Sequence, residues 1–263
     1  MNAPIDSYLW YFFLYSMIGY LCEICYCSIS EKRFVNRGFL HGPYIPVYGF
    51  GGVAVAVLVT DLKNWPILVF LGGMGITSII EYGAGVLLER VFHIRLWDYR
   101  ARKFHIRGRV CLGNSVLFGL LSLAVVYFIH PVMQQSLANL PERLRSAGAS
   151  VMLLSLAVDT TTSAMGMAAF TERLQRVKRL KAMLEPRLEL LSQGRQRLVE
   201  ALEAEIVRVS EQLRKSGNRI LDAFPSIGSD ELDMPSSLIR ELIDKRRGRK
   251  KRKEESGTLH DDD

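Results

Sequence analysis

Three acidic residues lie inside long apolar stretches of the sequence, and they are the first candidates for chemistry. Glu23 lies in the stretch 8–29, Glu81 in 66–88 and Asp159 in 149–170. A charged carboxylate at the centre of a bilayer costs at least ~2.5 kcal/mol, so such a group is seldom left without a partner. These residues therefore mark either a binding site or a structural contact inside a membrane.

Glu23 and Glu81 occupy equivalent positions, because each is the sixteenth residue of its apolar stretch. If both helices cross in the same direction, the two carboxylates lie at the same depth, in the inner leaflet. Asn114, near the start of the stretch 111–130, would join them there. We expect a polar cavity open to the cytosol. A separate structural salt bridge for each acid, or exposure at the end of a helix, is the alternative.

The loops between the apolar stretches supply polar and basic partners for these acids. Asn36, Arg37 and His41 follow the first stretch, and Arg107 and Arg109 precede the fourth. We expect Arg37 to pair with the carboxylates. Asp159 is followed by three threonines and flanked by serines, so hydrogen bonding between helices would explain it without any substrate.

The first apolar stretch also carries the pattern CxxCxC, formed by Cys22, Cys25 and Cys27. Thiolates at this spacing can hold a soft metal ion. No further set of ligands lies nearby in the sequence, so we interpret them as small packing residues and expect neither a metal nor another cofactor. Cys111 and these three lie near the inner ends of predicted spans, where a disulfide is not expected.

Five apolar stretches must position these residues, and each is close to the roughly 20 residues that a bilayer core requires. They cover residues 8–29, 44–60, 66–88, 111–130 and 149–170. The second is the shortest and begins with Gly49, Gly51 and Gly52, so it is expected to be tilted or partly re-entrant at its start. The predicted fold is an all-α polytopic membrane helix bundle of about five transmembrane helices with a cytosolic helical C-terminal extension.

Successive loops alternate between few and many lysine and arginine residues. The segment before residue 8 has none, the loops after the first and third stretches are rich, and those after the second and fourth are poor. Loops rich in these residues stay in the cytosol. The pattern predicts a cytoplasmic-membrane protein with its N-terminus outside and its C-terminus inside.

The last third of the chain differs in composition. Residues 171–221 have apolar residues at helical spacing, which predicts amphipathic or coiled-coil-like helices, with a kink or break near Pro186. Residues 222–263 are predicted to be disordered. Their basic run from Lys245 to Lys253 would attract anionic lipids at roughly 1 kcal/mol per close basic residue. A merely solvated tail is the alternative, and nucleic acid binding has no other support.

Several short motifs resemble a known family. They are Phe13-Leu-Tyr-Ser-Met-Ile-Gly19 leading to Glu23, Phe34 to Pro43 with Ile45 to Gly51, Glu81-Tyr with Leu87-Leu-Glu89, Trp97-Asp-Tyr99 and Gly108-Arg-Val-Cys-Leu112. Over residues 10–132 they resemble the putative ABC-transporter type IV family. The resemblance implies a multi-pass, permease-like membrane protein. It adds Trp97, Asp98 and Tyr99 to the candidate binding residues, and it includes Arg109.

The sequence has no GxxxxGK[ST] phosphate-binding loop, so this chain has no P-loop with which to hydrolyse ATP. A permease of this kind would need a separate ATPase subunit, and five spans suggest at least a dimer. Neither GxSxG nor HExxH occurs, which removes support for ordinary hydrolase or zinc-protease chemistry. An enzyme acting on lipid headgroups and a scaffold that recruits partners through its helical tail remain the alternatives.

Overall fold

The computed structural model describes residues 4–32 and 38–188, together with the single positions Glu205, Arg208, Val209, Ile220 and Ala223. It divides into two compact units, Met1–Ala168 with Asp222–Ser226, and Ala169–Leu221 with Ile227–Asp263.

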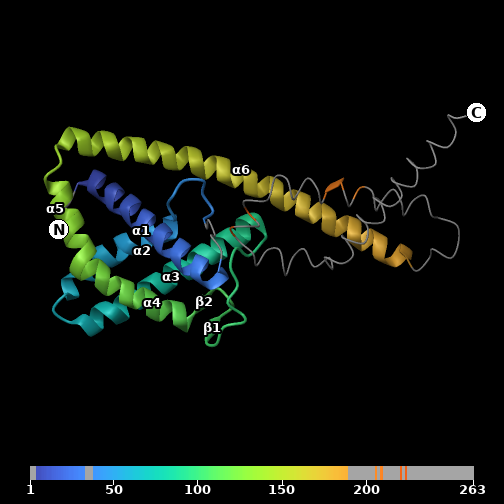
Figure 1. The fold of residues 1–263 in the computed structure, drawn as a ribbon, viewed down its shortest axis with the longest axis horizontal. Coiled ribbons are helices and arrows are strands. Elements are labelled where there is room, and N and C mark those ends of the chain that lie inside the picture. The colour runs from blue at the N-terminus through green and yellow to red at the C-terminus, as the bar shows by residue number, and fades with distance from the viewer. Residues whose placement is uncertain are drawn as a thin grey trace, which may run out of the picture. The chain divides into compact units, whose positions relative to one another are not determined.

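The described residues are mostly helical with little strand, which confirms the predicted fold class (Figure 1). Helix α1 packs on α2, α2 on α3, and α3 on α4. A short antiparallel pair of strands joins α3 to α4. In chain order the elements are α1 Ile5–Glu31, α2 Pro46–Leu58, η1 Thr60–Leu62, α3 Pro66–Phe92, β1 His105–Ile106, β2 Val110–Cys111, α4 Leu112–Ala124, η2 Val125–Ile129, α5 His130–Ala138 and α6 Glu142–Leu188.

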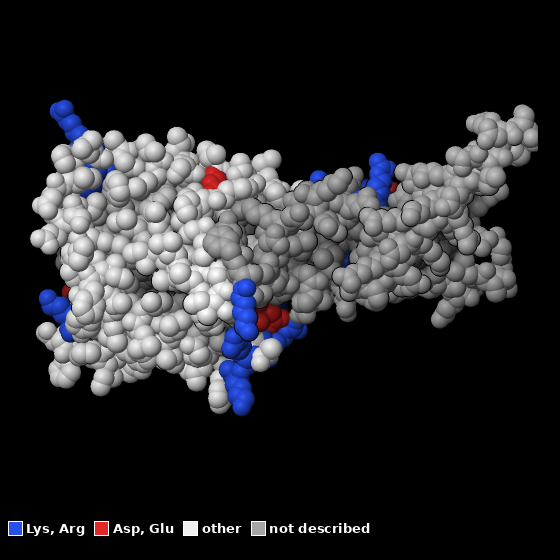
Figure 2. Space-filling view, in the orientation of Figure 1, with Lys and Arg blue, Asp and Glu red and all other residues white. Residues whose placement is uncertain are grey.

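Four helical segments are long and apolar enough to cross a membrane: Ile5–Ile29, Pro66–Phe92, Leu112–Ala138 and Glu142–Leu180. Large apolar side chains in the middle of these segments are exposed, including Ile79, Phe128 and Leu154. Figure 2 shows a broad uncharged surface with lysine and arginine near its borders. Exposed apolar side chains along helices of this length are typical of a surface that faces lipid.

Helix α2, in the second apolar stretch, has only 13 residues. It is about 20 Å long, whereas the hydrocarbon core measures about 30 Å. A non-helical stretch with several bends, Gly38–Ile45, precedes it and is called the return segment below. Leu40 and Tyr44 of this segment are buried in a cluster with Phe13. The Ile45 amide donates to the carbonyl oxygen of Ser16 at 3.1 Å, so α2 begins beside the middle of α1.

The fourth apolar stretch continues to Ala138, beyond the predicted end at residue 130. A π-helical turn, η2, connects α4 to α5 immediately before Pro131, and the His130 amide donates to the carbonyl oxygen of Val125. Proline has no amide proton and its ring clashes with the carbonyl four residues earlier in a regular helix. The wider π turn relieves this conflict, so the helix continues through the proline.

Gly49 allows α1 and α2 to approach closely. A Cβ atom at this position would lie 2.7 Å from the carbonyl oxygen of Phe12, which is backbone and cannot rotate away. We expect Gly49→Ala to lower the free energy of unfolding by about 1–3 kcal/mol, because overpacking outweighs the gain in helix propensity. Thermal unfolding in detergent measures this. The control is Gly75→Ala, where no atom lies within 4 Å of the added Cβ; equal melting temperatures for both variants would contradict the prediction.

The second unit contains the C-terminal part of α6. Phe170, Leu174 and Val177 are buried at helical spacing, and Val209 is buried too. Arg176 pairs with Glu205 at 2.7 Å. Helix α6 runs through Pro186 to Leu188, so it is not split there, and the predicted kink stays a prediction. Apart from the single positions named above, the predicted helices beyond Leu188 and the predicted disordered tail, with its run from Lys245 to Lys253, lie outside the described residues.

Candidate functional site

Glu23, Tyr48, Glu81, Tyr99 and Asn114 form a polar group that we call the carboxylate cluster. The Tyr48 hydroxyl donates to Glu23 Oε2 at 2.6 Å, and the Tyr99 hydroxyl donates to Glu81 Oε1 at 3.2 Å. Asn114 Nδ2 donates to the Tyr99 hydroxyl at 2.6 Å. The charges of Glu23 and Glu81 lie near enough to interact. Four residues that the sequence singled out, Glu23, Glu81, Tyr99 and Asn114, are therefore brought together from three helices and a loop.

Glu81 is the most constrained member of the carboxylate cluster. The residue is 7 % exposed, and its Oε2 has no hydrogen-bond partner among the described residues. Burial and the neighbouring Glu81 charge raise the pKa of Tyr99, so its hydroxyl stays protonated and acts as a donor. Because a second carboxylate interacts with Glu81, the cluster is suited to hold a proton or a small cation.

Asp159 has a different environment, at the return segment. Its carboxylate accepts hydrogen bonds from the backbone amides of His41 at 2.9 Å and Gly42 at 2.7 Å, and from the Tyr44 hydroxyl at 2.8 Å. Ser163 also donates to it at 3.0 Å. Asp159 thus provides acceptors for backbone amides of a non-helical segment. Such amides need a protein acceptor wherever water is scarce. The expected hydrogen bonding is present, but the main partner is a loop and not another helix.

The loop between α3 and α4 is held together by residues from the family motifs. Trp97 Nε1 donates to the carbonyl oxygen of Arg109 at 3.0 Å, and the Tyr99 amide donates to that of Gly108 at 2.8 Å. Arg107 and Gly108 both have positive φ, and the Arg109 amide donates to the carbonyl oxygen of Ile106. This is the conformation of a type I′ hairpin turn. Trp97 and Tyr99 therefore fix the backbone from which Arg107 and Arg109 project.

Asp98 stabilises the same loop and does not face the carboxylate cluster. It accepts hydrogen bonds from the Arg100 amide at 2.9 Å and from Arg100 Nε at 2.6 Å. Although burial opposes the change, these bonds hold the pKa of Asp98 below its ordinary value. A Cβ atom on Gly108 would lie 2.7 Å from Asp98 Oδ1, so the glycine is required by space as well as by its φ. We assign Asp98 a positioning contact within the loop.

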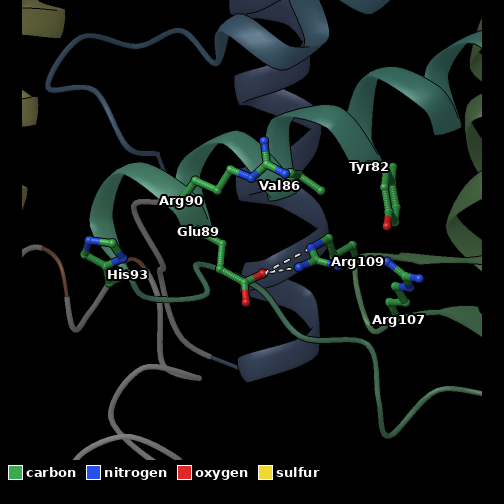
Figure 3. Close-up of a pocket in the computed structure, with 7 residues that line it drawn as sticks. All are labelled: Tyr82, Val86, Glu89, Arg90, His93, Arg107 and Arg109. Carbon is green, nitrogen blue, oxygen red and sulfur yellow. Dashed lines mark hydrogen bonds and ion pairs between the residues drawn. The ribbon is translucent and has the colours of Figure 1, made fainter.

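Arg109 lines an open pocket of about 610 Å³ at the C-terminal end of α3 (Figure 3). Glu89 accepts from Arg109 Nη2 at 2.6 Å and from Arg95 Nε at 3.0 Å. The Arg109 guanidinium also lies 5.5 Å from the centre of the Tyr82 ring. Sequence reasoning named Arg107 only as a partner for the acids, and it missed Tyr82, Glu89, Arg90 and His93 as members of a site. Their signal was the spacing of residues 82, 86, 89, 90 and 93, which places them on one helical face.

Other candidate residues are not brought into a site by the described part of the chain. Asn36 and Arg37 lie outside the described residues, so the predicted pairing of Arg37 with the carboxylates stays a prediction. Cys22 and Cys25 are exposed, whereas Cys27 is buried and its thiol donates to Glu23 at 3.7 Å. Within residues 4–32 and 38–188, no three His, Cys, Asp or Glu side chains are grouped to hold a metal ion.

Trp97 provides a test of how the hairpin is held. We expect Trp97→Phe to lower the free energy of unfolding by about 1–2 kcal/mol, because the Arg109 carbonyl loses its donor. Thermal unfolding in detergent measures the change. Trp65→Phe is the matched control, since the Trp65 residue is 67 % exposed. If the two variants melt at the same temperature, the Trp97 contact contributes nothing.

Four described helical segments that are long and apolar enough to cross a membrane define the chain as a mostly helical, multi-pass membrane protein. The family model described as Putative ABC-transporter type IV matches residues 10–164, and the chain belongs to this family. Neither the curated proteins nor the solved structures include a match to it.

Proposed function

We propose that this chain is the membrane-embedded permease component of a transporter, and that the carboxylate cluster binds the proton or small cation on which transport depends. One observation carries the proposal: Glu81 is buried in a candidate membrane span, its Oε2 lacks a described hydrogen-bond partner, and the Glu23 charge lies nearby. A carboxylate left in this state is costly in a membrane, which favours a role in binding over a role in stability.

The proposal includes the predicted orientation, with the N-terminus outside and the carboxylate cluster in the inner leaflet. The return segment and α2 together would then form the second crossing, because α2 alone is too short. Non-helical backbone at membrane depth is tolerated where it is covered by protein, and Asp159 supplies that cover.

Cysteine labelling tests this orientation. Ser136 is exposed near the end of α5, so Ser136→Cys should react with a membrane-impermeant maleimide in intact cells. Ser216→Cys should react only after permeabilisation. Labelling with the opposite pattern would reverse the orientation and move the carboxylate cluster to the outer leaflet.

A separate subunit must supply ATP hydrolysis, because the sequence has no P-loop. We expect an ATPase to copurify with the tagged chain from native membranes in mild detergent, and quantitative mass spectrometry measures its enrichment. An unrelated tagged protein with several spans is the control. Recovery of the chain without an ATPase, with turnover of lipid by the chain alone, would favour the enzyme alternative. Binding of cytosolic partners that depends only on residues 171–263 would favour the scaffold alternative.

A further inference from the structure

We infer that the pocket at the end of α3 binds a phosphate-bearing anion. Three arginines line it: Arg90 from α3, and Arg107 and Arg109 from the hairpin turn (Figure 3). Arginine is the side chain best suited to phosphate, because its planar guanidinium can donate two parallel hydrogen bonds. The pocket is separate from the carboxylate cluster, so the inference does not depend on the proposed transport function.

The charges that face the pocket favour an anion. Glu89 contributes one negative charge, and the C-terminal end of α3 contributes roughly half a negative charge. The three positive charges of the arginines exceed this negative charge. Arg109 is the one that pairs with Glu89, whereas Arg90 and Arg107 make no ion pair with any described residue. Two guanidinium groups are therefore available to a ligand.

The geometry also limits the type of ligand. A volume of about 610 Å³ accommodates a headgroup or a small organic phosphate. Glu89 and the Tyr82 ring hold Arg109 in place before any ligand arrives. This arrangement lowers the entropic cost of binding. Since α3 is a candidate membrane span that ends at Phe92, the pocket lies where the phosphate of an anionic lipid would be found. A soluble phosphate compound has the same chemistry.

The test uses the full chain in detergent and four probes: dihexanoyl phosphatidylglycerol, dihexanoyl phosphatidic acid, dihexanoyl phosphatidylcholine and inorganic phosphate. Calorimetry measures the affinity of each probe for the unmodified chain, the double variant Arg90→Gln/Arg107→Gln, and the control Arg102→Gln/Lys103→Gln. The control removes the same charge from exposed positions of the same loop that do not line the pocket. We expect the Arg90→Gln/Arg107→Gln variant to bind the probes at least tenfold more weakly than the unmodified chain. The control should bind them less than twofold more weakly.

The probes distinguish the two sources of phosphate. Binding of the anionic lipids without inorganic phosphate identifies a lipid headgroup, and binding of inorganic phosphate identifies a soluble ligand. An equal loss of probe affinity in the two double variants would show that surface charge alone attracts the probes, and it would overturn the inference. Absence of binding by the unmodified chain would overturn it too. The single variant Arg90→Gln guards against misfolding, because Arg90 is exposed and makes no ion pair with a described residue.

Discussion

Replacement of Asp159 by alanine is expected to release the return segment from α6 and to lower the free energy of unfolding by about 3–5 kcal/mol. Two backbone amides and the Tyr44 hydroxyl would lose their acceptor. A hydrogen bond to a charged group contributes about 1.5–3 kcal/mol, and a buried donor without a partner costs a similar amount. The expected decrease in the free energy of unfolding is smaller than the summed contributions of three such bonds, because removing the carboxylate also removes the cost of burying it.

Thermal unfolding and limited proteolysis measure this effect. The Asp159→Ala variant should melt earlier and be cleaved faster within Gly38–Ile45, the return segment. Asp159→Asn keeps one acceptor oxygen, so its loss of stability should be intermediate between those of the unmodified chain and Asp159→Ala. Asp61→Ala is the matched control, since Asp61 is exposed in η1. An Asp159→Ala protein that melts and is cleaved like the unmodified chain would show that the return segment holds its conformation without this carboxylate.

Glu81→Gln is expected to lower the transport-coupled ATPase activity of the copurified complex at least tenfold while leaving the melting temperature unchanged or higher. Glutamine keeps the shape of the side chain and an oxygen to accept from Tyr99. It removes a buried carboxyl group that interacts with Glu23, so stability should not fall. Loss of activity without loss of stability separates a functional carboxylate from a structural one.

ATP turnover in nanodiscs and thermal unfolding of the same preparations provide the two measurements. Glu142→Gln is the control, because Glu142 is an exposed acid at the start of α6. Glu23→Gln should lower activity as Glu81→Gln does if both carboxylates hold the same proton or cation. A Glu81→Gln complex with normal turnover and a lower melting temperature would assign Glu81 to stability alone, and the carboxylate cluster would cease to be a transport site.

The sequence by itself determined the helical class, the places of the helices and part of the site. The five stretches of apolar residues coincide with helices α1, α2, α3, α4 to α5, and α6, because the length of an apolar stretch is a local property and the bilayer imposes it. The regular rise of a helix also fixes relative depth. Equal positions in two spans that run in the same direction therefore predict that Glu23 and Glu81 lie at the same depth, and this stays a prediction.

The tertiary structure decided which groups the remaining polar residues contact. Asp159 binds backbone amides more than a hundred residues away in the sequence. The pattern of side chains does not indicate which backbone amides a distant carboxylate will bind. The pocket at the end of α3 depends on a hairpin whose turn brings Arg107 and Arg109 to the last turns of α3. Loop conformation results from many weak long-range contacts, such as those of Trp97 and Tyr99. The sequence therefore predicted the loop's charge, whereas only the folded chain determined where that charge points.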